Sequence, residues 1–210
     1  MKIKLLLLGV LILILASCGS SQRVGKTGAA KSARQLVTLS DEQQRKYDYF
    51  FLEATRLKGK KEYDAAFDLL KHCLTINPQA ASALYEISQY YMFLKQVPQG
   101  QAALEEAVES APDNYWYSQA LASLYQQQNE KEKAIGLLET MATRFPGKRE
   151  SLFALLDLYN QQEDYGKVIG TLDRLEEIMG KNEQLTMEKF RIYLQMKDDK
   201  SAFREIENLV

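Results

Sequence analysis

The pattern of apolar and polar positions divides the chain into three parts. Residues 5–15 form an apolar run that only Gly9 interrupts, and residues 19–40 are rich in Gly, Ser, Ala and basic residues without a sustained apolar period. The third part begins with a capping-box sequence, in which the Ser40 hydroxyl and the Gln43 side chain satisfy free N–H groups of a first helical turn. We therefore expect ordered helices from this point onward.

A repeat of 34 residues governs the rest of the chain. Pro78, Pro112 and Pro146 are spaced by 34 residues, and such a period indicates a repeat architecture. With each proline at position 32, repeats begin at Tyr47, Ala81, Tyr115, Arg149 and Glu183. Small or apolar residues then align at positions 8, 11, 20, 24 and 27. Position 20, for example, holds Ala66, Gly100, Ala134, Val168 and Ala202.

These columns resemble the tetratricopeptide repeat family over residues 47–210. The resemblance implies an all-α fold of about five antiparallel helix pairs, which stack into a right-handed superhelix over residues 41–210. The fifth repeat matches least well, with Lys189 and Phe190 at positions 7 and 8, and it is incomplete. Its last apolar stripe, at Ile206, Leu209 and Val210, has no following helix. We therefore expect either further repeats after residue 210 or another surface that covers the stripe.

The start of the chain resembles a bacterial lipoprotein signal. After the short basic start, the apolar run ends in Leu15-Ala16-Ser17-Cys18, which is similar to the lipobox, and the run is too short to span a bilayer. We predict a signal peptide over residues 1–17, lipidation of Cys18, and a flexible basic tether over residues 18–40. A plain signal peptide followed by an incidental cysteine is the alternative.

Charge and composition narrow the function classes. All 28 acidic residues but only 21 of the 27 basic residues lie beyond Ser40, so the repeats carry a charge of about −7. This balance argues against nucleic acid as a partner. His72 is the single histidine, and Cys73 is the single cysteine apart from Cys18. We expect no metal site, no cofactor, no internal disulfide and no enzyme activity, and we interpret Cys73 as a buried structural residue.

The resemblance also locates a candidate groove. In tetratricopeptide arrays the first helix of each pair lines the concave surface through positions 2, 5, 9, 12 and 13. The candidate groove residues at these positions are Phe51, Tyr85, Gln89, Trp116, Gln119, Gln126, Phe153, Asp157, Asn160 and Arg191. Some of the aromatic side chains could instead pack between helices. The carboxylate clamp of some family members needs Lys and Asn where Phe51 and Thr55 stand, so a C-terminal acidic tail is not the expected ligand.

These observations predict a membrane-anchored, non-enzymatic scaffold that binds segments of other envelope proteins. The residues after Cys18 favour an outer membrane location facing the periplasm, and the chain looks like multi-repeat lipoproteins common in Bacteroidetes. Two alternatives stay open. One is glycan binding through exposed groove aromatics, and the other is a non-catalytic part of a longer envelope protein.

Overall fold

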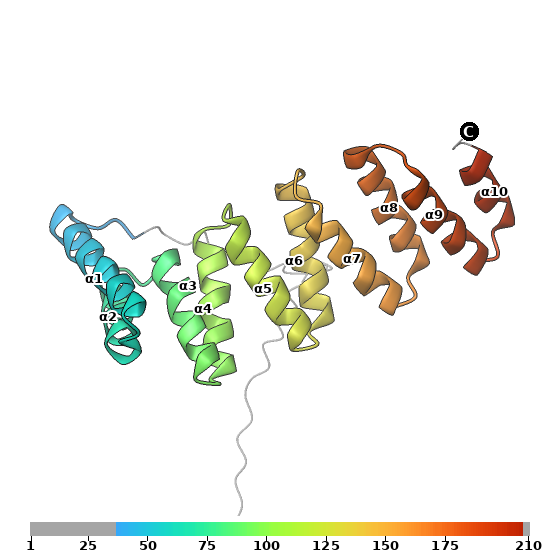
Figure 1. Ribbon diagram of the computed structural model, residues 1–210. Helices are drawn as coiled ribbons and strands as arrows, with labels where there is room; N and C mark the ends of the chain where they lie inside the picture. Colours follow the sequence, from blue (N-terminus) through green and yellow to red (C-terminus); the bar gives the residue numbers. More distant parts are fainter. Residues whose placement is uncertain (1–36, 208–210) are drawn as a thin grey trace, which may run out of the picture. The chain divides into compact units, whose positions relative to one another are not determined.

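The computed structural model describes residues 37–207, which form a row of ten helices (Figure 1). The helices are α1 (Asp41–Gly59), α2 (Tyr63–Ile76), α3 (Ala81–Phe93), α4 (Val97–Ser110), α5 (Tyr115–Gln127), α6 (Lys131–Arg144), α7 (Glu150–Gln161), α8 (Tyr165–Met179), α9 (Glu183–Gln195) and α10 (Asp199–Glu207). The predictions for the signal peptide, for Cys18, for the tether up to residue 36 and for Leu209 and Val210 fall outside the described residues.

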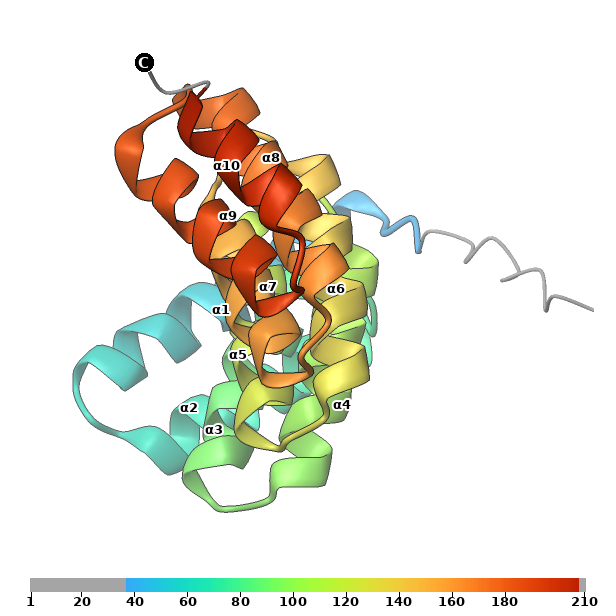
Figure 2. The same ribbon diagram turned by 90° about the vertical axis from the view of Figure 1, so that its right-hand side faces the viewer.

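The helices pack in sequential pairs, as the repeat predicts. Each helix packs mainly on its neighbours along the chain, so α1 pairs with α2, α3 with α4, and so on to α10. Figure 2 shows α3, α5 and α7 in one layer and α4 and α6 in the other. The prediction of an all-α array of helix-turn-helix repeats is confirmed.

The predicted frame agrees closely with the helix boundaries. Helices α3, α5 and α9 begin at the predicted repeat starts, and α7 begins one residue later, at Glu150. Helix α1 begins six residues before Tyr47, because the predicted capping box forms there. The Gln43 amide donates to Ser40 Oγ over 3.3 Å, and the Ser40 amide donates to Gln43 Oε1 over 2.9 Å.

Small residues let the paired helices approach closely. Position 20 is buried in every repeat, and position 27 is buried in the first four. At Gly100 an added Cβ would lie 2.8 Å from Met92 Cε and 3.1 Å from the Ser88 carbonyl oxygen. Helices α3 and α4 therefore approach closely at this glycine, on the side of α3 that bears the buried Ser88.

The fifth repeat replaces apolar packing by a buried ionic cluster. Lys189 is only 5% exposed, and it stands at position 7, where the three preceding repeats have Ile87, Leu121 and Leu155. Its Nζ lies 2.7 Å from Asp173 Oδ1, 3.1 Å from Glu176 Oε2 and 3.3 Å from Glu205 Oε2.

This cluster explains the poor match of the fifth repeat to the family pattern. The lysine side chain packs inside the array because carboxylates from α8 and α10 neutralise its charge. Phe190 is half-buried, with its ring 6.4 Å from that of Phe203 in α10.

None of the described helices combines the length and apolar character that crossing a membrane requires.

Candidate binding face

The candidate surface consists of the side chains that α1, α3, α5, α7 and α9 present at positions 2, 5, 9, 12 and 13 of their repeats. We call it the first-helix face. Seven of the ten predicted residues on it are exposed, namely Gln89, Trp116, Gln126, Phe153, Asp157, Asn160 and Arg191. The other three are partly buried, namely Phe51, Tyr85 and Gln119.

Trp116 is the most exposed of the predicted aromatic residues, at 68%. The Asn114 side chain caps α5 by accepting the Trp116 amide over 3.0 Å, which fixes the start of the helix. The Lys148 ammonium lies 5.8 Å from the Trp116 ring centroid. The backbone of Trp116 is thus held firmly while most of its side chain faces solvent.

Two other predicted aromatic residues use their ring faces inside the protein. Tyr85 stacks on Tyr117 of the next repeat with the ring centroids 4.7 Å apart, and Phe51 stacks on Tyr47 at 5.8 Å. These rings therefore stabilise the array and offer a ligand less surface than Trp116 does.

A small cleft of about 90 Å³ lies between α5 and α7. It brings together two predicted residues, Gln119 and Gln126, and its walls include the small side chains of Ala122, Ser123 and Ala154. Amide groups beside small residues suit the backbone of an extended segment, since an amide both donates and accepts hydrogen bonds.

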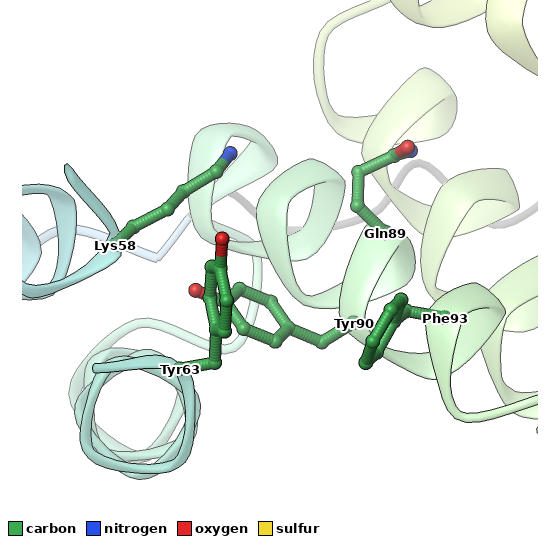
Figure 3. A pocket seen from close by; sticks show the side chains of 5 residues that line it. All are labelled: Lys58, Tyr63, Gln89, Tyr90 and Phe93. Carbon is green, nitrogen blue, oxygen red and sulfur yellow. The ribbon is translucent and has the colours of Figure 1, made fainter. Parts of the chain in front are cut away.

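A larger slot of about 240 Å³ lies between the first two repeats (Figure 3). It is lined by Lys58 of α1, Tyr63 of α2, and Gln89, Tyr90 and Phe93 of α3. The Tyr90 ring lies between those of Tyr63 and Phe93, and Lys58 and Gln89 extend along the opposite edge. Phe93 is 79% exposed. The face thus has an aromatic slot with a polar edge.

Of the slot residues, Gln89 is one of the ten candidates predicted from the sequence. The repeat frame also places Phe93 at position 13 of the second repeat and Lys58 at position 12 of the first, so both belong to the first-helix face. Tyr63 could not be found in this frame, because it is the first residue of the second helix α2 and the groove positions lie on first helices.

Electrostatics keep the slot lysine charged. Lys58 Nζ donates to Glu86 Oε2 over 2.6 Å, and this hydrogen bond raises the pKa of Lys58 above its usual value. Burial raises the pKa of the Tyr90 hydroxyl. Both groups therefore stay protonated at neutral pH.

The described residues offer little for catalysis. Within residues 37–207 no three His, Cys, Asp or Glu side chains are grouped so that they could hold a metal ion. Cys73 is fully buried, and this burial raises its pKa to about 11, so the thiol stays protonated and unreactive at neutral pH. His72 is exposed, with its ring 4.4 Å from that of Phe50.

Stacked helical hairpins with a polar and aromatic first-helix face define a helical repeat scaffold, a class that is typically non-catalytic. Residues 57–121 match the family model of the tetratricopeptide repeat. The chain is thus similar to tetratricopeptide repeat proteins over this segment. No curated protein sequence matches the chain.

Solved structures of similar fold are distant in sequence. MamA from Desulfovibrio magneticus RS-1 has a TM-score of 0.53 and 13% identity over 82% of this chain and 95% of its own. YrrB, described as a tetratricopeptide protein with an unusual peptide-binding site, has a TM-score of 0.56 and 13% sequence identity. The similarity covers 79% of this chain and 86% of YrrB. A tetratricopeptide repeat protein from Parabacteroides merdae has a TM-score of 0.55 and 17% sequence identity over 78% of each chain. At such identities these similarities concern the fold alone.

Proposed function

We propose that the protein is a non-catalytic scaffold that binds extended segments of other proteins on its first-helix face. One observation carries this proposal. Large apolar side chains stand in solvent at first-helix positions, where Phe93, Trp116 and Phe153 are exposed. Exposed rings beside amides are typical of recognition surfaces, because each ring buries a large area at a small cost in side-chain entropy.

Amide side chains complete the case for a protein ligand. Gln89, Gln126 and Asn160 are exposed on the same face, and their amides can pair with the backbone of an extended segment. YrrB, whose fold is similar, is described as having a peptide-binding site. That description supports the proposal by analogy.

A selection from a random peptide library on the immobilised protein tests this proposal. We expect selected peptides to bind at least about fivefold more weakly to the variant Phe93→Ala/Trp116→Ala/Phe153→Ala, since each truncation removes apolar contact. Phe203→Ala is the matched control, because Phe203 is an exposed phenylalanine on α10. Equal binding to both variants, or binding of oligosaccharides in place of peptides, would refute the proposal.

We propose further that the scaffold is anchored in a bacterial cell envelope through acylated Cys18, at the outer membrane and facing the periplasm. The support is the sequence Leu15-Ala16-Ser17-Cys18 at the end of an apolar run. Two or three acyl chains on one cysteine would anchor the protein stably. The partners are then other envelope proteins.

Metabolic labelling with a palmitate analogue in the native cell tests the anchor. The wild-type protein should incorporate the label and sediment with outer membranes, and Cys18→Ser should do neither. Label in the Cys18→Ser protein, or wild-type protein in the soluble fraction, would contradict this location.

A further inference from the structure

The slot between the first two repeats differs from the other surfaces of the first-helix face. The rings of Tyr63, Tyr90 and Phe93 surround it with carbon, and only Lys58, Gln89 and the Tyr63 hydroxyl bring polar groups to its edge. Its volume of about 240 Å³ lies below the range of roughly 300–1,000 Å³ that is usual for drug-sized ligands. One large side chain fits this space better than a whole small molecule does.

The two hairpin turns beside the slot carry apolar and basic residues that are not required to form the turn. All five hairpins turn through the same backbone conformation, with a positive φ at position 15. In the third and fourth repeats the turn residues are uncharged or acidic, at 126–129 and 160–163. In the first two repeats the corresponding segments, 58–61 and 92–95, contain four lysines and the exposed pair Phe93 and Leu94.

Since an identical turn forms without them, these apolar and basic side chains are not required by the fold. Lys60, Lys61 and Lys95 are exposed at the slot end of the hairpins. Lys58 gives one of its three donors to Glu86 and is still partly exposed. The surroundings of the slot therefore favour acidic groups next to an apolar one.

We propose that the slot is the anchoring subsite for one large apolar side chain, aromatic or long aliphatic, of an extended protein segment with acidic residues on either side of it. This inference rests on the proposed scaffold function and names its ligand. The apolar side chain enters between Tyr63 and Phe93 and covers the Tyr90 ring. Acidic neighbours lie near Lys58 and the turn lysines, and Gln89 pairs with the segment's backbone.

The slot favours a side chain over a sugar. A pyranose would press several hydroxyl groups against the three aromatic rings, where only Lys58, Gln89 and the Tyr63 hydroxyl offer partners. Hydroxyls left without partners on burial weaken binding. The site also does not require a chain terminus, since it holds a side chain and not a terminal carboxylate.

Nuclear magnetic resonance titration of the full chain with defined peptides tests the inference. The probe is acetyl-Asp-Glu-Phe-Asp-Glu-amide, which has no free C-terminal carboxylate. We expect saturable shifts of residues around the slot. Affinity should fall at least about fivefold when the peptide's Phe becomes Ala. It should fall further when its acids become Lys, and also when salt rises from about 0.05 M to about 0.5 M.

Protein variants locate the effect. Phe93→Ala should lower the affinity for the probe peptide at least about fivefold. The variant should fold normally, because the Phe93 ring is mostly exposed. Phe203→Ala, which changes an exposed ring on α10, should leave the affinity unchanged. Circular dichroism checks that both variants are folded.

The alternative outcomes separate this inference from the proposed function. If the probe peptide binds wild type and Phe93→Ala with equal affinity, the slot is not the anchoring subsite. Tighter binding of cellohexaose than of the peptide would also refute this inference. If library peptides bind through Trp116 or Phe153 but the probe does not bind the slot, the scaffold function stands and the anchoring subsite is wrong. If neither the library nor the probe yields binding, both proposals are wrong.

Discussion

Each helical hairpin closes with a residue of positive φ at position 15. These residues are Lys61, Lys95, Asn129, Glu163 and Lys197, with φ between 55° and 66°. The amide of the next residue donates back to the carbonyl of position 11, as Glu130 does to Tyr125 over 2.8 Å. Only Asn129 is of a type that favours this conformation. Four of the five turns could therefore not be recognised from residue type, although the repeat frame gives their spacing.

The substitution Glu163→Gly should stabilise the protein. Glycine adopts a positive φ without steric cost, and this gain outweighs its greater freedom in the unfolded chain. We expect the free energy of unfolding to rise by about 0.5 to 1 kcal/mol, measured by urea denaturation. Glu163→Val is the control and should lower it, because a β-branched residue is strained there. A destabilised glycine variant would contradict this account.

Lys189 shows why a single residue can depart from a family pattern. Burial opposes its charge, but hydrogen bonds to Asp173 and Glu176 outweigh burial and raise the pKa of Lys189 above the usual value. The repeat frame identifies Lys189 as anomalous. It cannot identify the three partners, because they come from α8 and α10.

Lys189→Met should lower the free energy of unfolding by about 3 kcal/mol, because it leaves Glu176 buried without its cation and leaves Glu205 with Lys181 alone. A raised pKa means that the lysine's contribution is complete below the ordinary lysine pKa and is lost only as pH rises through the higher folded value. The difference between wild type and variant should thus stay constant from pH about 7 to about 10. A difference that shrinks within this range would be inconsistent with the ionic cluster.

At the scale of helices, tyrosines link consecutive repeats. Tyr125 Oη donates to Glu105 Oε1 over 2.9 Å, and Tyr159 Oη donates to Glu139 Oε1 over the same distance one repeat later. Position 11 of one first helix is thus bound to position 25 of the preceding second helix. In the first junction position 25 is a lysine, so Tyr91 has no carboxylate at this position.

Removing one link should weaken one junction. We expect Tyr159→Phe to lower the free energy of unfolding by about 1.5 kcal/mol, the lower end of the range for a hydrogen bond to a charged group. Tyr91→Phe is the matched control and should change it much less. Equal losses in both variants would show that the hydroxyl–carboxylate bond is not what stabilises the junction.

The same tyrosine predicts a pH effect. Burial, and then the hydrogen bond to Glu139, raise the pKa of Tyr159 to about 12. Its contribution to stability is therefore present below pH about 10 and is lost as pH rises toward about 12. Wild type should lose more stability than Tyr159→Phe over this interval, and equal losses in chemical denaturation would contradict the raised pKa.

At the scale of the whole molecule, the array could be predicted and the exposure of its face could not. The helix starts follow from columns of small and large residues that every repeat shares. At position 5, Tyr85 is partly buried against Tyr117 of the next repeat, Phe51 is partly buried against Tyr47 of its own helix, and Phe153 is exposed. The slot also joins α1, α2 and α3, so it needs the packed structure.

Because each repeat contacts mainly its neighbours, the array presents a continuous row of first helices to a partner. Exposed rings and amides along this row form the candidate binding face. We propose that a native protein partner binds at this face in the cell, and this is the central claim about the molecule.

Site-specific photo-crosslinking in the native cell tests this claim most directly. A crosslinking residue at Gln126, exposed on α5, should give discrete protein adducts that disappear in the Trp116→Ala/Phe153→Ala background. The same residue at Glu132, exposed on α6, serves as the control and should give none. Adducts of equal yield at both positions, or adducts at Glu132 alone, would contradict binding on the first-helix face.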